Sequence, residues 1–71
     1  MAVSYNKLWK LLIDNKMKKI ELMEAAGIGT TTLSKLGKDQ FVSMEVLVKI
    51  CKVLDCNFGD IVDYIPEKNI D

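Results

Sequence analysis

The 71-residue sequence contains no histidine and no arginine, and these absences narrow its chemistry. Histidine is the usual proton carrier near neutral pH, so general acid–base catalysis would fall to Asp, Glu, Lys or Tyr. No paired carboxylates stand out from the charged surface pattern, and no glycine-rich loop is long enough to cradle a nucleotide. We therefore expect a protein that is not an enzyme. Without arginine, the commonest bidentate contact to guanine is also missing, and lysine is the only strongly basic side chain.

Cysteine and long apolar runs are also scarce. Cys51 and Cys56 are the only thiols, and a structural zinc site needs four ligands, so we expect no metal or other cofactor. The two thiols are interpreted as small hydrophobic side chains. No apolar run reaches the ~18 residues of a membrane span, and no secretion signal precedes the helical pattern. The sequence predicts a cytoplasmic protein with no membrane contact, and it indicates no small-molecule ligand.

Length and composition predict a single domain over residues 1–71, with a core at about 5–65 and a short tail at 66–71. Almost half of the residues, 49%, are hydrophobic, which argues against disorder. A chain of this size buries roughly 60% of its unfolded surface, so it can fold without disulfides or metals.

The formal net charge is zero, but the charges are unevenly distributed along the chain. Residues 1–38 carry seven lysines and three acidic residues, a net charge of +4. Residues 39–71 carry three lysines and seven acidic residues, a net charge of −4. A surface that binds nucleic acid is therefore expected in the first half.

Hydrophobic spacing predicts five short helices and no strand. Tyr5, Leu8, Trp9, Leu12 and Ile13 form one helical stripe, with Ser4 as its expected N-cap. The other helices are expected at about 18–26, at 30–36 with Gly37 as its stop, from the cap Ser43 to about 54, and from the cap Asn57 to Pro66.

The stretch GIGTTTLSKLGK, residues 27–38, is the most informative part of the sequence. Glycine within a three- to four-residue turn between two short helices is typical of a helix-turn-helix, whose second helix enters the DNA major groove. Three threonines open that helix although they are poor helix formers. Their hydroxyls can donate to phosphate or base acceptors, and their methyl groups can pack on thymine. Leu33 and Leu36 are expected to face inward and hold the helix in place.

Residues 5–65 resemble the Cro/CI-type helix-turn-helix domain, the xenobiotic-response-element family of small bacterial and phage regulators. The resemblance rests on three segments: MKKIELMEAAGI at 17–28, TTLSKL at 31–36 and SMEVLVKICKVL at 43–54. It implies an all-α, five-helix, lambda-repressor-like fold with a central helix-turn-helix. Lys18 departs from the pattern, because Ser or Thr is the usual cap before the second helix.

The resemblance also implies a set of DNA contacts. Lys19 stands where members often use Gln to contact the backbone, and Thr30, Thr31 and Thr32 stand where bases are read. Later contacts on the same helix fall on Ser34 and Lys35. The following loop, which usually touches phosphate, offers Lys38 and Gln40.

Two functions remain open from the sequence. The first is sequence-specific binding of double-stranded DNA by a transcriptional regulator, a repressor or a control protein of a phage or mobile element, acting as a dimer. Its expected dimer surface includes Tyr64, Ile65 and Ile70. The second is a protein-interaction module on the same fold, such as an antitoxin or adaptor, which the zero net charge and the missing arginine favour. The sequence does not reveal the operator, the regulated genes or whether the protein represses or activates.

Overall fold

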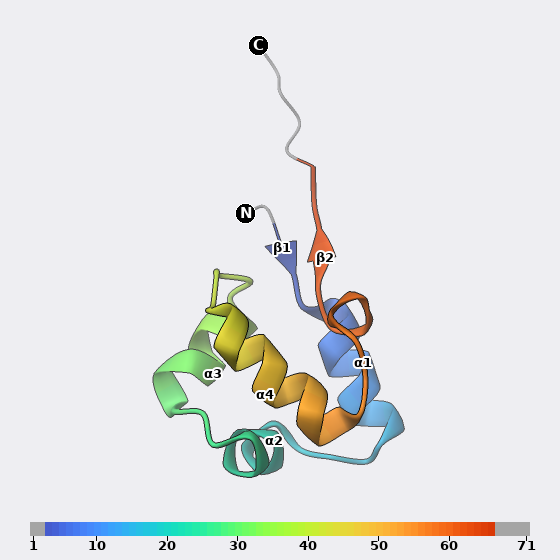
Figure 1. Ribbon diagram of the computed structural model, residues 1–71, viewed down its shortest axis with the longest axis vertical. Coiled ribbons are helices and arrows are strands. Elements are labelled where there is room, and N and C mark those ends of the chain that lie inside the picture. Colours follow the sequence, from blue (N-terminus) through green and yellow to red (C-terminus); the bar gives the residue numbers. More distant parts are fainter. Residues whose placement is uncertain (1–2, 67–71) are drawn as a thin grey trace.

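The computed structural model describes residues 3–66. Four α-helices account for most of these residues, and α4 lies between α1 and α3 with α2 across one end (Figure 1). A two-stranded antiparallel sheet lies at the other end. The elements in chain order are β1 (Val3–Ser4), α1 (Asn6–Asp14), α2 (Lys19–Ala26), α3 (Thr30–Gly37), α4 (Met44–Leu54), the 3-10 helix η1 (Phe58–Asp60) and β2 (Asp63–Tyr64).

The fold is mostly helical, as predicted, but the expected fifth helix is replaced by the short η1 and the strand β2, and strands were not expected. Asn57 does open a turn, because its side chain accepts from the amide of Phe58 and the Asp60 carboxylate accepts from the amide of Asn57. This turn continues for only three residues as η1. The β-branched and aromatic residues that follow favour extended backbone. Val3 pairs with Tyr64, and Ser4 pairs with Asp63. The two strands therefore form a ladder between segments that are far apart in the sequence.

The predicted core is largely confirmed. The buried residues come from all four helices and from the segments beside them: Tyr5, Leu8, Leu12, Leu22, Ala26, Ile28, Leu36, Leu47, Ile50 and Ile61. Two expectations fail. Ile13 is 73% exposed, because α1 ends one residue later and no element covers the edge of its stripe. Leu33 is half-buried, which leaves Leu36 as the buried anchor of α3.

Ser4 does not cap α1 as expected. It lies in β1, and its hydroxyl accepts from the amide of Asn6 over 3.2 Å, while Tyr5 occupies the N-cap position. Ser43 does cap α4, because its hydroxyl accepts from the amide of Val46 over 3.2 Å. For α2 the missing cap hydroxyl at Lys18 is partly offset, since the Glu21 carboxylate accepts from the Lys18 amide over 2.7 Å.

All four helices end beside a residue in the left-handed conformation, and only one of the four is glycine. Helix α2 ends at residue 26 as expected, and Gly27 follows it with φ 70°. Helix α3 ends at Gly37, which is its last residue, and the left-handed residue that follows is Asp39, with φ 56°. The other two left-handed residues are Lys16 and Asp55. Asp39 gains a compensating contact, since its carboxylate accepts from the amide of Tyr5 over 3.0 Å.

Candidate nucleic-acid interface

Helices α2 and α3 form one unit joined by a three-residue turn. The chain leaves α2 through the left-handed Gly27, where the amide of Ile28 donates to the carbonyl of Met23 over 3.1 Å. Ile28 then enters the core between two glycines. Gly29 adopts an extended conformation and becomes the N-cap of α3. The turn therefore fixes the direction of α3 relative to α2 through one buried isoleucine and one left-handed glycine.

The first turn of α3 carries the hydroxyl groups and is open to solvent. Thr30 and Thr31 are exposed, and Thr32 is half-buried. Because Gly29 has no side chain, no side chain caps this helix, and the first amides of a helix have no partner within it. The result is a cluster of hydroxyls and amide donors at a helix end that carries partial positive charge. Such an end is suited to phosphate and to acceptors on base edges.

Further along α3, Ser34 and Lys35 are exposed as well. Leu36, on the opposite side, has no exposed surface and holds the helix against the core. The face of α3 that points away from the protein is thus built from short hydroxyl side chains and one lysine. An α-helix with short side chains can approach the floor of the major groove closely.

The loop after α3 is held by a residue that the sequence reading assigned only to the core. The Tyr5 hydroxyl donates to the carbonyl of Gln40 over 2.8 Å, and the Tyr5 amide donates to the Asp39 carboxylate over 3.0 Å. Burial is the main cause that raises the pKa of the Tyr5 phenol. Lys38 and Gln40, the predicted phosphate contacts, keep exposed side chains on this fixed backbone. The signal for Tyr5 was present, since a tyrosine in an apolar stripe needs an acceptor for its hydroxyl.

Lys19 lies apart from the loop, at the start of α2. Its side chain is exposed, and its ammonium nitrogen lies 4.3 Å from the centre of the Trp9 ring. A lysine above an indole face gains a cation–π attraction. The contact positions the ammonium group at the first turn of the helix-turn-helix unit.

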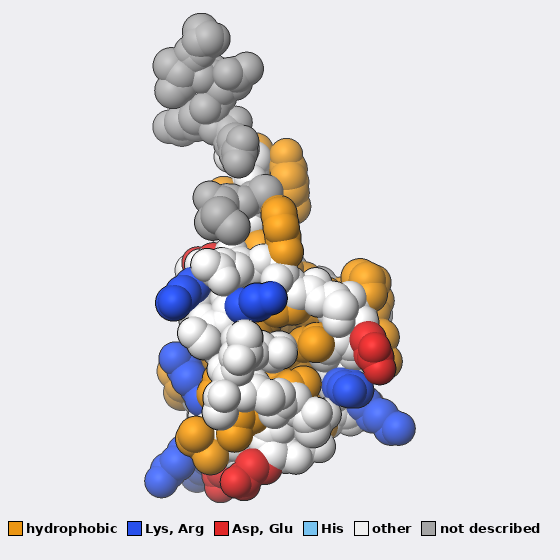
Figure 2. Space-filling model, turned by 90° about the vertical axis from the view of Figure 1, so that its left-hand side faces the viewer, with side chains coloured by type: hydrophobic (Ala, Val, Ile, Leu, Met, Phe, Trp, Pro, Cys, Tyr) orange, Lys and Arg blue, Asp and Glu red, His pale blue; other side chains and the backbone are white. Residues whose placement is uncertain are grey.

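Lysine side chains flank the face that carries α3. Figure 2 shows uncharged side chains and backbone across the middle of this face, with lysines around it and acidic side chains at its edges. The single acidic residue between Thr30 and Val42 is Asp39, and the Tyr5 amide holds its carboxylate. The face therefore presents lysines around a helix surface whose one charged side chain is Lys35.

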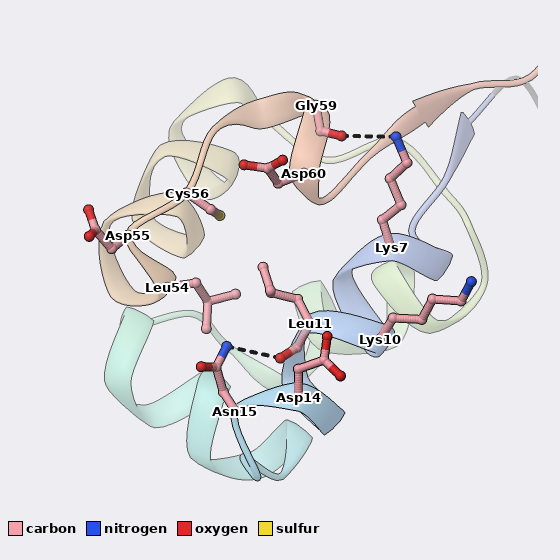
Figure 3. Close-up of a pocket in the computed structure, with 10 residues that line it drawn as sticks. All are labelled: Lys7, Lys10, Leu11, Asp14, Asn15, Leu54, Asp55, Cys56, Gly59 and Asp60. Atoms are coloured by element: carbon pink, nitrogen blue, oxygen red, sulfur yellow. Dashed lines mark hydrogen bonds between the residues drawn. The ribbon is translucent and has the colours of Figure 1, made fainter.

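Acidic residues from α1, the end of α4 and η1 gather on another side. A hollow of about 530 Å³ between α1, the end of α4 and η1 is lined by Asp14, Asp55 and Asp60 together with Lys7 and Lys10 (Figure 3). The Lys7 ammonium donates to the carbonyl of Gly59 over 3.1 Å and lies 2.9 Å from the Asp63 carboxylate. In Figure 1, α4 lies between this side and α3. Lys7 thus joins α1 to η1 and β2.

The two cysteines lie in the same region and are half-buried. Burial, the neighbouring Cys51 thiol and the carboxylates of Asp60 and Asp55 raise the pKa of Cys56 to about 11. Within residues 3–66, no three His, Cys, Asp or Glu side chains are placed to hold a metal ion. Over the same residues, no helix is long and apolar enough to cross a membrane.

Fold and site together define a helix-turn-helix domain. The sequence model of the Cro/C1-type HTH DNA-binding domain matches residues 7–67, which is most of the chain. The chain therefore belongs to this family of DNA-binding domains.

Two relatives are similar to most of this chain. An uncharacterized HTH-type transcriptional regulator of Bacillus subtilis (strain 168), YozG, is 41% identical over 61 residues, which cover 83% of this chain and 73% of that protein. The crystal structure of the transcriptional regulator VanUg is 59% identical in sequence and superposes with a TM-score of 0.90. That match covers 93% of this chain and 88% of the VanUg chain.

Proposed function

We propose that this protein is a cytoplasmic transcriptional regulator that binds double-stranded DNA with the first turn of α3 in the major groove. One observation carries the proposal: Thr30 and Thr31 are exposed at an uncapped helix end, while Leu36 is completely buried beneath the same helix. Membership of a DNA-binding family supports it. No catalytic step is assigned to the protein.

The proposed contacts divide into two groups. Thr30, Thr31, Thr32 and Ser34 meet base edges or nearby phosphates, since hydroxyls donate and accept and the threonine methyl groups suit thymine. The second group fixes the protein on the backbone through charge and amide donors. Its members are Lys19, Lys35, Lys38 and Gln40.

A dimer completes the proposal. One small domain with three proposed lysine contacts reaches few phosphates, and two half-sites about one helical turn apart double the contacts and read a palindrome. Tyr64 is 75% exposed and Ile65 is exposed on the segment that includes β2, which makes them the proposed dimer contacts. Ile70, also expected there, lies outside the described residues.

Selection of duplexes from a random pool, followed by a salt titration with the selected sequence, tests the function. Binding through Z phosphates gives a slope of log K against log salt near −0.9Z. We expect enrichment of a palindrome, a slope of roughly −4 or steeper for a dimer, and twice the monomer mass in complex. Absence of enrichment together with a flat salt dependence would contradict DNA binding.

The zero net charge favours a second candidate, a protein-interaction module such as an antitoxin or adaptor. Such a module would show no salt-dependent duplex binding. The same titration therefore separates the two functions.

A further inference from the structure

An open apolar groove lies between the end of α1 and the start of α2, outside the face that carries α3. Trp9, Ile13, Met17 and Ile20 supply its apolar lining, and the groove has a volume of about 620 Å³. We name it the Trp9 groove after its largest side chain. Neither the core nor the proposed contacts to bases require a surface of this kind.

Two isoleucines of the Trp9 groove are unusually accessible. Ile13 is 73% exposed and Ile20 is 54% exposed, and Trp9 between them is half-buried. Single exposed apolar residues are ordinary, but several around one groove mark a binding surface. Its most exposed side chains leave the groove open to solvent, whereas most small-molecule sites bury the greater part of the ligand. It has the form that receives the apolar face of a helix.

The charges of the Trp9 groove are all of one sign. Lys18 and Lys19 belong to its lining, and none of the residues lining this groove is acidic. Two acids adjoin the lining along the chain: Glu21 is engaged by the Lys18 amide, and Asp14 lines the other hollow, beside Lys7 and Lys10. Lys19 also covers the Trp9 ring, so apolar surface and positive charge meet at one place. The complementary partner therefore combines apolar anchors with carboxylates.

We propose that the Trp9 groove binds an acidic amphipathic helix of a partner protein, and that this binding competes with DNA. The competition rests on the proposed function, in which Lys19 contacts a phosphate. A partner carboxylate paired with Lys19 excludes that phosphate. The partner then acts as an antagonist that releases the regulator from its site.

The probe is a displayed library of helical peptides with leucine, isoleucine or phenylalanine at i, i+3, i+4 and i+7 and random charged residues elsewhere. Selected peptides are synthesised and titrated against the full chain without DNA. Trp9 is the only tryptophan, so its fluorescence reports occupation of the groove directly. We expect enriched peptides to carry net negative charge and to change Trp9 fluorescence saturably.

Two substitutions with matched controls locate the site. Ile13→Ser removes an exposed apolar contact and should weaken peptide binding about tenfold, whereas Val48→Ser, on the exposed face of α4, should not change it. Lys18→Glu reverses a charge of the groove and should weaken binding at least fivefold, with Lys52→Glu as control. Circular dichroism verifies that each variant folds. If Ile13→Ser does not fold, the result with Lys18→Glu decides the test.

Several outcomes would overturn the proposal: no enriched peptide, enrichment of basic peptides, or binding that is insensitive to both groove substitutions. Loss of dimer mass in Ile13→Ser would overturn it too, since a second copy would then fill the groove. Competition is measured separately with the selected duplex, and simultaneous binding of peptide and duplex would refute antagonism. Peptide binding without duplex binding would instead refute the proposed function alone.

Discussion

Helices α3 and α4 are both short and adjacent, but they are held in different ways. Helix α4 has eleven residues, buries Leu47 and Ile50, and is capped by Ser43. Helix α3 has eight residues, buries Leu36 alone, and begins at Gly29 with no side-chain cap. The buried residues and the cap of α4 therefore serve the stability of the fold. The sparing attachment of α3 leaves its first turn available for a ligand, and this difference can be tested residue by residue.

The largest expected effect is the loss of the single anchor of α3. Leu36→Ala should lower the free energy of unfolding by about 2–5 kcal/mol, because a fully buried leucine leaves a cavity. Leu33→Ala should cost clearly less, since Leu33 is half-buried. Urea denaturation of both variants measures the difference. Equal losses would mean that α3 is attached along its length, as α4 is.

Substitutions of exposed residues of α3 should weaken DNA binding without changing the stability of the fold. Thr31→Ala and Lys35→Ala should each weaken duplex binding by roughly 1–3 kcal/mol. Their unfolding free energies should stay within about 0.5 kcal/mol of the parent. Lys52→Ala, an exposed lysine on α4, is the matched control and should leave both quantities unchanged. If Thr31→Ala and Lys35→Ala bind duplex normally, the assignment of α3 to the major groove is wrong.

The two helix starts should respond in opposite ways to changes at the cap. Ser43→Ala removes the hydroxyl that accepts from Val46 and should cost about 1 kcal/mol, a fall in Tm of roughly 4–8 °C. Gly29→Ser should stabilise by a few tenths of a kcal/mol, because Gly29 is extended and nothing lies within 4 Å of an added Cβ atom. Thermal denaturation of the two variants tests this. A Tm of Ser43→Ala equal to that of the parent protein would contradict the predicted difference between the two helix starts.

The smallest effect concerns Cys56, beyond the carboxyl end of α4. Its pKa is raised to about 11, so the thiolate is scarce at pH 8 and alkylation should be slow until the pH passes about 10. Since the folded pKa exceeds the ordinary value of 9.0, the protonated thiol contributes stability below pH 9 that is lost as the pH rises through 11. Mass-resolved alkylation against pH measures the titration. Rapid alkylation of the folded protein at pH 8 would contradict the shielded environment of Cys56.

Local patterns predicted the helices well where apolar spacing and caps agreed. The stripe of α1 is confirmed except at Ile13, and the cap at Ser43 and the end of α2 at residue 26 are confirmed. The missed features depend on partners distant in sequence. The strand at Asp63–Tyr64 forms only because Val3–Ser4 lies beside it, and no local period indicates so short a pair. Asp39 replaces Gly37 as the left-handed residue, where its carboxylate reaches the Tyr5 amide.

The candidate site was predicted residue by residue, and its contacts with DNA stay a prediction. Of its α3 residues, Thr30, Thr31, Ser34 and Lys35 are exposed and Thr32 is half-buried. What the sequence did not indicate is how the site is supported. Tyr5 holds the loop after α3 through two hydrogen bonds across more than thirty residues, and Lys19 rests on Trp9. Such contacts depend on the packing of α1 against the rest of the fold, so a pattern within one helix cannot reveal them.

Amide chemical-shift mapping with the selected duplex tests the central claim most directly. We predict that the largest changes fall on the amides of Thr30, Thr31 and Thr32 and continue through Lys35 and Lys38, while β1, η1 and β2 change little. Changes concentrated in η1 and the sheet, with the first turn of α3 unaffected, would contradict the account.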